Sequence, residues 1–403
     1  MAALNKGIFI VGAKRTPFGA FGGSLKALTA TDLCVHSSKA ALEVAGLDAS
    51  AVDVTFVGNT IQSSKDAAYL SRHVALRSGV PIEKPSLTIN RLCGSGFETV
   101  ILGAESILLG NAEVALTGGT ENMSMCPMVV DGNAARWGVP LGQGLQLEDS
   151  LWAGLTDSYA GTPMGVTAEN LAEKYGITRE ECDEYGFRSQ MAWGEANKAG
   201  VFEAELAPVE VKGRKGPQLV TADESPRPDV QLEKMRSLKP VFKKDGCVTA
   251  GNASGISDGA GSVLLASEAA VAKYNLTPLA RLAGWGRAGC APEIMGIGPV
   301  PAIAGALAAA GTSLGEVGLV EINEAFAAQY LACEKELGLD RAVANKSGGA
   351  IALGHPLGAS GARITAHLAH ALATGRAGPG VTKALGSACI GGGQGIAVLL
   401  EKC

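Results

Sequence analysis

Two cysteines lie in glycine-rich turns that are far apart in the sequence. Cys93 is in residues 90–97 and Cys389 is in residues 386–393. Glycines leave backbone N–H groups uncovered, and a thiol at the start of a helix experiences the positive end of the helix dipole. The sequence therefore predicts that Cys93 is a nucleophile with a lowered pKa, able to form a thioester. The alternative for each cysteine is a buried structural thiol.

One histidine occupies a turn that would fix its ring. His355 lies between Gly354 and Pro356, outside any expected helix or strand, which suits a general base whose direction matters. His367 and His370 are spaced like a metal-binding pair, but without a nearby carboxylate they fit a partly exposed helix surface better. Two thiols and one base indicate acyl chemistry. A redox pair of thiols is the alternative, although such pairs usually lie close together in sequence.

Asn323 follows an apolar segment, residues 317–322, that reads as a buried strand. Side chains at the carboxyl end of such a strand lie where α/β proteins place their sites. An amide there can hold a water molecule or an oxyanion. A simple turn role for the asparagine is the alternative.

The elements that position these residues occur twice. Residues 41–46 and 306–311 both read as a helix end closed by glycine, at an offset of 265 residues. At the same offset, residues 52–59 fall on residues 317–324, and both read as a strand followed by a polar turn. Two similar α/β halves explain the repeat, and we expect the two cysteine turns to occupy equivalent places in them. Chance similarity between alanine-rich helices is the alternative.

Between the halves the composition changes to a proline-rich segment. It contains one well-marked helix, residues 178–198, with a capping box between Thr178 and Glu181. The apolar segment 262–266 then reads as a strand that rejoins the first half. We therefore predict three parts: residues 1–120 as the first half, completed by about 251–275, residues 121–250 as an inserted loop domain, and residues 276–403 as the second half.

The composition is that of a globular α/β enzyme: 403 residues, 47% hydrophobic, 18% charged, with 55 glycines. The 34 basic and 39 acidic residues are mixed, which disfavours nucleic acid as a partner. Nine cysteines without a CxxC pair disfavour a disulfide framework and a zinc site, and indicate a reducing compartment. We expect no metal and no transmembrane segment. Because residues 7–11 read as a buried strand, any organelle address is expected to be uncleaved or absent.

Several blocks, in this order and over the whole chain, resemble those of the thiolases. They are NRLCGSG at 90–96, NEAFA at 323–327, GGAIALGHPLG at 348–358 and GSACIGGGQG at 386–395, with further matches at 15–19, 118–124 and 250–255. Residues 69–74 and 147–152 resemble the mitochondrial branch of the family that acts on 3-ketoacyl-CoA. The resemblance implies two βαβαβαββ halves packed as five layers, α-β-α-β-α, with an inserted loop domain over the coenzyme A (CoA) site.

The resemblance also implies an activity: reversible CoA-dependent cleavage of 3-ketoacyl-CoA to acetyl-CoA and a shortened acyl-CoA, as in fatty acid β-oxidation. It implies that Cys93 takes the acyl group, His355 draws the proton from Cys93, and Cys389 exchanges the proton of acetyl-CoA. The implied oxyanion donors are the backbone N–H groups of Cys93 and Gly391 at one site, and His355 with a water held by Asn323 at the other.

For the rest of the site the resemblance implies CoA contacts by Arg227 and Ser254. CoA would be a substrate, and no bound cofactor is expected, because the glycine-rich turns do not match the GxGxxG pattern of nicotinamide or flavin sites. The family implies a homodimer or homotetramer. The mitochondrial matrix is the expected location, with the cytoplasm as the alternative. Ser347 and Val230 depart from residues common in the family.

Three other functions are alternatives. An acetyl-CoA C-acetyltransferase would make acetoacetyl-CoA from two acetyl-CoA with the same residues. A decarboxylating ketoacyl synthase is disfavoured by the turn of Cys389. A silent acyl-CoA or lipid carrier would lack at least one of Cys93, His355 and Cys389, and all three are present.

Overall fold

The computed structural model describes residues 7–213 and 216–403, and ten of their strands form one mixed sheet. The sheet order is β14-β15-β16-β13-β1-β12-β5-β3-β4, with β2 beside β12. The bounds of these strands are β1 Ile8–Arg15, β2 Gly19–Ala20, β3 Val54–Gly58, β4 Ser86–Ile89, β5 Val114–Asn122, β12 Ser257–Ser267, β13 Ala280–Gly289, β14 Leu319–Ile322, β15 Lys383–Ile390 and β16 Gln394–Glu401.

The sheet consists of two similar halves. β1-β12-β5-β3 in one half corresponds to β13-β16-β15-β14 in the other, and the halves meet where two residue pairs join β1 to β13. Helix α1 (Ala30–Ala45) ends at Gly46 with φ 63°, and α10 (Pro299–Ala310) ends at Gly311 with φ 65°. Glycine adopts this left-handed conformation without strain. The predicted repeat, helix end followed by strand, is therefore present in both halves.

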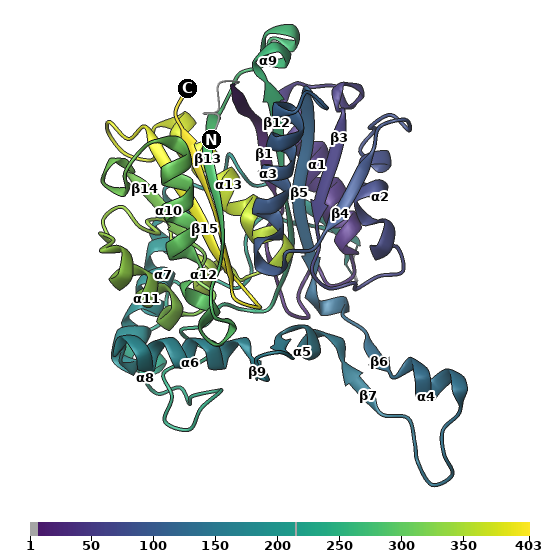
Figure 1. Cartoon of the computed structure of the whole chain (residues 1–403), viewed down its shortest axis with the longest axis vertical. Helices are drawn as coiled ribbons and strands as arrows, with labels where there is room; N and C mark the ends of the chain where they lie inside the picture. The colour runs from purple at the N-terminus through teal and green to yellow at the C-terminus, as the bar shows by residue number, and fades with distance from the viewer. Residues whose placement is uncertain (1–6, 214–215) are drawn as a thin grey trace.

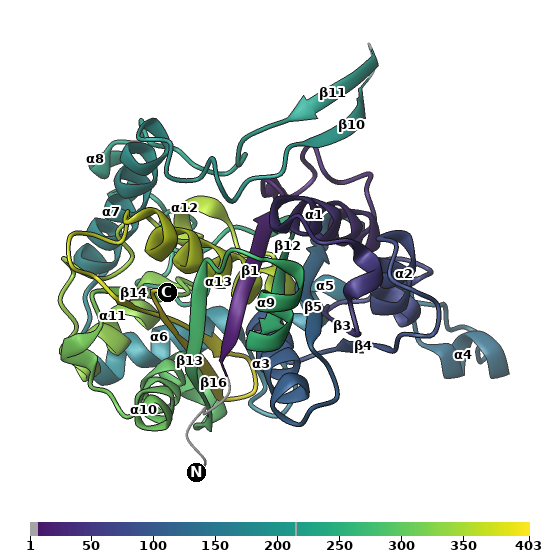
Figure 2. The same cartoon turned by 90° about the horizontal axis from the view of Figure 1, so that it is seen from above.

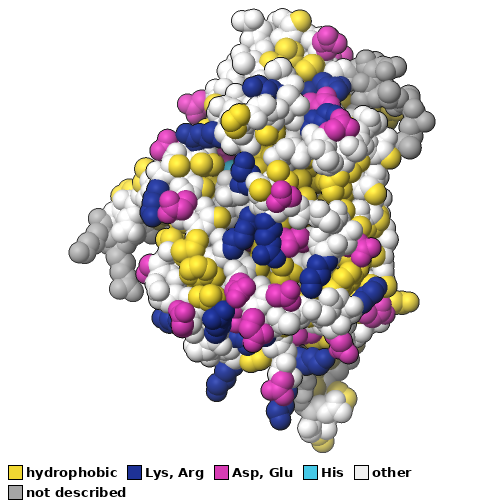
Figure 3. Space-filling view, turned by 90° about the vertical axis from the view of Figure 1, so that its left-hand side faces the viewer, with side chains coloured by type: hydrophobic (Ala, Val, Ile, Leu, Met, Phe, Trp, Pro, Cys, Tyr) yellow, Lys and Arg dark blue, Asp and Glu magenta, His cyan; other side chains and the backbone are white. Residues whose placement is uncertain are grey.

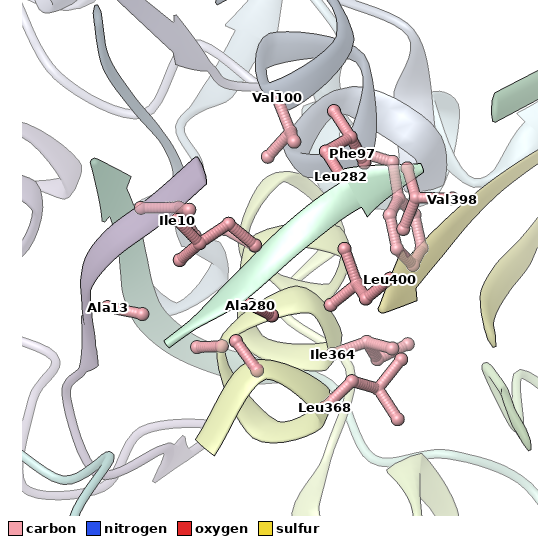
Figure 4. Packing of buried hydrophobic residues seen from close by; sticks show 14 of the residues in the cluster. Ile10, Ala13, Phe97, Val100, Ala280, Leu282, Ile364, Leu368, Val398 and Leu400 are labelled. Atoms are coloured by element: carbon pink, nitrogen blue, oxygen red, sulfur yellow. The ribbon is translucent and has the colours of Figure 1, made fainter. Parts of the chain in front are cut away.

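Helices and the two halves of the sheet alternate as five layers, as the thiolase resemblance implied. Helices α3 (Ser95–Leu108) and α13 (Leu357–Thr374) pack together in the middle, between the half-sheets (Figures 1 and 2). Helices α1 and α2 (Leu70–Arg77) cover the outer face of one half, and α10 and α11 (Ala327–Leu337) cover that of the other. The central core contains side chains from strands of both halves and from α3 and α13 (Figure 4).

The two central helices approach each other through glycines. A Cβ atom on Gly96 would collide with the backbone nitrogen of Ala362, and one on Gly361 would collide with the backbone nitrogen of Phe97. Protein interiors do not tolerate such overlaps. The close crossing fixes the N-terminal ends of α3 and α13 relative to each other.

A long insertion connects β5 to β12, and β12 then lies between β1 and β5. Helix α7 begins after Thr178 with the predicted capping box to Glu181. The segment β6–α4–β7 forms an arm that extends away from the body (Figure 1), and β10 and β11 project on another side (Figure 2). The inserted elements are β6 Met128–Val130, α4 Gly132–Trp137, β7 Leu147–Asp149, α5 Ser150–Gly154, β8 Thr156–Asp157, β9 Thr162–Pro163, α6 Met164–Tyr175, α7 Arg179–Lys198, β10 Val209–Gly213, β11 Gly216–Val220 and α8 Leu232–Arg236.

The remaining helices are α9 (Glu268–Tyr274) and α12 (Ala350–Leu353). None of the helices in the described ranges is long and apolar enough to span a membrane. On the face shown in Figure 3, Lys and Arg side chains are interspersed with Asp and Glu.

A buried ionic cluster attaches the insertion to the layered body. Arg15 on β1 donates to Glu205 (2.6 Å) and to Asp223 (2.6 Å), both from the insertion. The Nδ1 atom of His367 on α13 lies 2.7 Å from the second oxygen of Glu205. His367 and His370 are both buried, so the expected exposed helix surface was wrong. The reason is that α13 belongs to the central layer, which helical periodicity alone does not reveal.

Candidate active site

Cys93 lies in a 3₁₀ turn, Leu92–Gly94, directly before α3. Burial raises the pKa of its thiol to about 11, and the nearby Glu121 carboxylate adds to this, while N–H groups of Gly391 and Cys93 act in the opposite direction. The predicted lowered pKa was therefore wrong, because desolvation outweighs the two hydrogen-bond donors. The resting group is a neutral thiol, and it needs a base before it can act as a nucleophile.

His355 occupies the turn between α12 and α13, and both its backbone and its ring are fixed. Its N–H donates to Gly255 (2.9 Å), and its Nδ1 lies 2.6 Å from the hydroxyl of Ser360. That hydroxyl donates to the carbonyl of Pro356, so it accepts the proton of Nδ1 and leaves the Nε2 lone pair available. Burial, and then the charge of Arg363, lower the pKa of His355 to about 3. The ring is therefore a neutral imidazole with Nε2 as its proton acceptor.

Asn323 directly follows β14, as predicted, and its side chain reaches the imidazole. Its Nδ2 lies 3.3 Å from Nε2 of His355, and its backbone N–H donates to Ser387 (2.8 Å). Its Oδ1 is buried and has no hydrogen-bond partner among the described residues. A buried acceptor of this kind calls for a donor from water or substrate.

Cys389 lies at the end of β15 and is fully buried against Met295 and Ala325. Burial, and then the neighbouring Cys93, raise the pKa of this thiol well above its ordinary value. The two cysteine turns are not equivalent, contrary to expectation. Cys389 is in the hairpin between antiparallel β15 and β16, whereas the counterpart of Cys93 at the start of a central helix is His355. Glycine-rich sequence serves both kinds of turn, so composition did not distinguish them.

Two buried carboxylates support this site, and neither was assigned a role from the sequence. Glu121 at the end of β5 accepts N–H groups of Thr60 (3.1 Å), Ile61 (3.0 Å) and Gly358 (2.9 Å), and burial raises its pKa to about 7. By bonding Gly358 it holds the start of α13 beside His355. The available signals were its place in the block 118–124 and an acidic residue in an otherwise uncharged strand.

The second carboxylate, Glu324, accepts the hydroxyls of Tyr185 (2.8 Å) and Ser189 (2.7 Å) from α7 and the N–H of Ile351 (3.2 Å) from α12. It therefore joins the insertion to the segment before His355. Ser360, five residues after His355, was also missed, because its contact depends on the turn into α13.

Cys93 and His355 line one apolar cavity of about 350 Å³. Ser254 lies in its wall and also borders a second cavity of about 340 Å³ that contains Arg227. The guanidinium of Arg227 donates to three carbonyls of its own loop, residues 224–226, each at 2.9 Å. The structure thus gathers Cys93, His355, Asn323 and Cys389 at one place, with Ser254 in the wall and Arg227 in the neighbouring cavity.

This arrangement combines a neutral thiol, a neutral imidazole acceptor and backbone N–H donors in an apolar cavity. It can transfer an acyl group to sulfur and move a proton, because each charge that develops has a partner. Within the ranges 7–213 and 216–403, no set of three His, Cys, Asp or Glu side chains could hold a metal ion.

This chain is similar to known proteins over nearly its whole length. Residues 8–269 match the thiolase N-terminal domain, and residues 276–402 match the thiolase C-terminal domain. The chain is 58% identical over 399 residues to mitochondrial 3-ketoacyl-CoA thiolase of Homo sapiens, and 45% identical over 396 residues to an acetyl-CoA acetyltransferase of Pseudomonas aeruginosa. The alignments cover 99% and 98% of this chain, and 99% of each relative.

Solved structures of thiolases have the same fold as this chain. The crystal structure of human mitochondrial 3-ketoacyl-CoA thiolase superposes with a TM-score of 0.97, covering all of both chains, and its complex with CoA superposes with 0.96. Sequence, layer order and site geometry point the same way, and the chain belongs to the thiolase family of acyltransferases.

Proposed function

We propose that this chain cleaves 3-ketoacyl-CoA with CoA, giving acetyl-CoA and an acyl-CoA shortened by two carbons. The observation that carries the proposal is the shared cavity of Cys93 and His355 with Cys389 behind it. The high full-length identity to the mitochondrial 3-ketoacyl-CoA thiolases supports this substrate class over acetoacetyl-CoA synthesis.

In the first half-reaction, Sγ of Cys93 attacks the keto carbon while its proton passes to Nε2 of His355. The developing oxyanion is stabilised by N–H donors, for which Gly391 and Cys93 are the candidates. The Cα–Cβ bond of the substrate then breaks, leaving an acyl thioester on Cys93 and the enolate of acetyl-CoA. Cys389 donates its proton to that enolate carbon. The high pKa of its thiol favours the protonated form that this step requires.

In the second half-reaction, the thiol of free CoA attacks the acyl thioester. Its proton passes to the thiolate of Cys389, the bond between the acyl carbon and Cys93 breaks, and the proton on His355 returns to Sγ of Cys93 as the shortened acyl-CoA leaves. The unpartnered Oδ1 of Asn323 is suited to hold the water that would assist His355 at the second oxyanion position.

CoA is proposed to enter as a substrate, with no bound cofactor. Its reactive end would lie in the cavity of Cys93, and its other end in the adjoining cavity that contains Arg227, with Ser254 between them. A related solved structure contains CoA. We further propose a homodimer or homotetramer located in the mitochondrial matrix, since the human relative is named as mitochondrial.

Mapping of the acyl adduct tests the proposal. Protein incubated with acetoacetyl-CoA, without free CoA, should carry an acyl group on Cys93 in peptide mass spectra. Cys93→Ala should abolish both adduct and turnover, whereas Cys126→Ala, a thiol packed in the same apolar cluster, should retain both. Full activity of Cys93→Ala, or a stable adduct elsewhere, would contradict the proposal.

The alternative, acetoacetyl-CoA synthesis, corresponds to the name of the 45% identical acetyl-CoA acetyltransferase, a less similar relative than the 58% identical 3-ketoacyl-CoA thiolase. Rates over 3-ketoacyl-CoAs of increasing chain length decide between the two. A 3-ketoacyl-CoA thiolase should process chains longer than acetoacetyl-CoA, while strict preference for acetoacetyl-CoA would favour the alternative.

A further inference from the structure

The two candidate oxyanion donors come from different halves of the molecule. Cys93 lies in the turn Leu92–Gly94 before α3, and Gly391 lies in the turn between β15 and β16. Two such donors stabilise an oxyanion only if their spacing is held to within about 0.5 Å. The second turn consists of three glycines, residues 391–393, whose backbone is easily deformed. A contact between the two turns is therefore needed to fix the spacing.

Arg91 makes that contact. It is two residues before Cys93, and its Nη1 donates to Oε1 of Gln394 (2.9 Å). Gln394 is the first residue of β16 and directly follows the glycines. The side chain of Leu92 also lies against the second turn, because a Cβ atom on Gly391 would be 3.3 Å from its Cδ1. Arg91 thus joins the start of the nucleophile's turn to the end of the glycine turn.

The guanidinium of Arg91 is itself fixed to α3. Its Nε lies 2.9 Å from Oε2 of Glu98, a buried residue in the first turn of that helix. The same carboxylate accepts from Nε (3.0 Å) and Nη2 (2.9 Å) of Arg287 on β13. Paired hydrogen bonds between arginine and carboxylate define their geometry closely. Because Arg287 already neutralises Glu98, removal of Arg91 leaves no unpaired buried charge.

The backbone between Arg91 and Cys93 is strained. Leu92 has φ 48°, a left-handed conformation that is uncommon for a bulky residue. Such conformations persist where surrounding contacts hold them, and they gather at functional sites. Within the turn, the hydroxyl of Ser95 accepts the N–H of Arg91 (2.9 Å) and donates to the carbonyl of Leu92 (2.7 Å). The side chain of Arg91 holds the turn from outside, through the other half of the molecule.

We propose that Arg91 is a positioning residue for the oxyanion site: it fixes the spacing between the N–H groups of Cys93 and Gly391. When Sγ attacks the carbonyl carbon, the carbonyl oxygen gains negative charge, and both N–H groups donate to it. Without Arg91 the glycine turn moves relative to α3, so the two donors no longer act together. The loss falls on the transition state, because the carbonyl of the bound substrate carries little charge. This inference rests on the proposed function.

Arg91→Met tests the inference, because it keeps the length of the side chain and removes its donors. Arg91→Lys keeps the positive charge in a conservative variant. Arg281→Met is the matched control, since Arg281 pairs with Glu401 at the end of β16 opposite to Gln394 and is similarly exposed, 35% against 32% for Arg91.

Two reactions of Cys93 separate an oxyanion effect from a general effect on the turn. Acylation by acetoacetyl-CoA, without free CoA, passes through an oxyanion. Alkylation by iodoacetamide displaces iodide at a saturated carbon and develops no oxyanion. Peptide mass spectrometry follows both rates. The kcat and KM for thiolysis of acetoacetyl-CoA and the thermal unfolding temperature are measured in parallel.

In Arg91→Met, acylation and kcat should each fall by about tenfold, with KM nearly unchanged, because the donors are misplaced. Alkylation should stay close to the wild-type rate. Arg91→Lys should recover part of the kcat, and Arg281→Met should match the wild type in both reactions. A purely structural role of Arg91 would slow acylation and alkylation equally, or would lower the unfolding temperature alone.

Unchanged acylation in Arg91→Met, or an equal fall of acylation and alkylation, would overturn the inference. If this variant does not fold, Gln394→Met replaces it: the acceptor is lost while Arg91 stays beside Glu98, so acylation alone should slow, and unchanged acylation would again overturn the inference. Absence of a Cys93 adduct and of thiolysis in the wild type would reject the proposed function itself. An active wild type with an equally active Arg91→Met would reject only the role of Arg91.

Discussion

At the scale of residues, the site is built from groups that are neutral at rest. Burial raises the pKa of Cys93 to about 11 and lowers that of His355 to about 3, so neither carries charge near pH 7. A preformed thiolate–imidazolium pair would be costly in this apolar cavity. The site therefore depends on substrate to supply the electrophile and on N–H groups to receive the charge. This makes orientation of the imidazole by Ser360 and Asn323 decisive.

Ser360→Ala tests that orientation. Removal of the hydroxyl takes away the acceptor for Nδ1–H and frees the ring to adopt the other tautomer. We expect kcat for thiolysis to fall by about tenfold with little change in KM, since binding of CoA does not involve this hydroxyl. Ser360→Thr keeps the hydroxyl and should retain more activity. Equal activities of the alanine and wild-type proteins would show that the ring is held by other contacts.

The buried imidazole also predicts an effect of pH on stability. His355 has an ordinary pKa of 6.5 in the unfolded chain and about 3 when folded, so the unfolded state binds more protons between these values. The free energy of unfolding must therefore decrease as pH falls through this window. His355→Gln removes this contribution and should lower the stability loss between pH 7 and pH 5 by about 2 kcal/mol.

Urea unfolding at the two pH values measures this difference. Glu121, whose pKa is raised to about 7, acts in the opposite direction, but it is present in both proteins and cancels in the comparison. The same pH dependence in His355→Gln and the wild type would show that the imidazole is not buried in its neutral form.

At the scale of elements, the central layer decides where the nucleophile and the base meet. Both reside at the N-terminal ends of α3 and α13, and these helices cross closely only because Gly96 and Gly361 lack side chains. Gly119 on β5 extends this contact, since a Cβ atom there would collide with the carbonyl oxygen of Gly358. The carboxylate of Glu121, two residues later, bonds the N–H of the same Gly358. Strand β5 therefore determines the position of the turn after His355.

Gly119→Ala should displace that turn. We expect a loss of about 3 kcal/mol in the free energy of unfolding, together with a reduced kcat in the protein that remains folded, because overpacking forces the backbone apart. Gly315→Ala is the control: its Cβ would meet nothing within 4 Å. Chemical denaturation and thiolysis assays on both variants measure the effects. A fully stable and active Gly119→Ala would show that the turn is not held at this contact.

At the scale of the whole molecule, apolar side chains are exposed on the arm formed by β6, α4 and β7. Trp137 is 81% exposed and Leu147 is 67% exposed, with Met128, Leu141 and Leu145 also outside the body. An exposed apolar surface of this kind indicates an interaction site. A second copy of this chain is the occupant that fits the proposed homodimer or homotetramer, since α4 and its strands make few contacts with their own body (Figure 1).

Trp137→Ser with Leu141→Ser should therefore lower the assembly state. In sedimentation velocity at micromolar protein, we expect the molar mass to fall from that of a tetramer to a dimer, or from that of a dimer to a monomer. Turnover per chain should stay unchanged, because these residues lie outside the catalytic cavity. Leu109→Ser, a substitution at a side chain 76% exposed at the end of α3, is the control and should keep the wild-type mass. An unchanged mass in the arm variant would exclude the arm from assembly.

Much of this protein was predictable from local sequence. The repeat at an offset of 265 residues, the capped helix α7, the turn of His355 and the place of Asn323 after its strand all depend on short-range patterns of glycine, capping and hydrophobicity. The sequence blocks that resemble those of the thiolases also predicted the activity and the five-layer fold. The solved structure and the sequence relative confirm both predictions. The division of the chain into three parts at about residues 120, 250 and 275 stays a prediction, as do the roles of the individual site residues.

The tertiary structure alone decided the charge states of these residues and the residues that they contact. Burial depends on which elements cover a side chain, so the raised pKa of Cys93 and the buried His367 could not be read from their neighbours in sequence. Glu121 on β5 and Glu321 on β14 reach α13 across the layers, through the N–H of Gly358 and the guanidinium of Arg363, and Ser360 reaches His355 through the turn into α13. The sequence by itself determined the reactive groups and the turns that carry them. Long-range packing decided their charge state, because solvent exclusion is a property of the assembled layers.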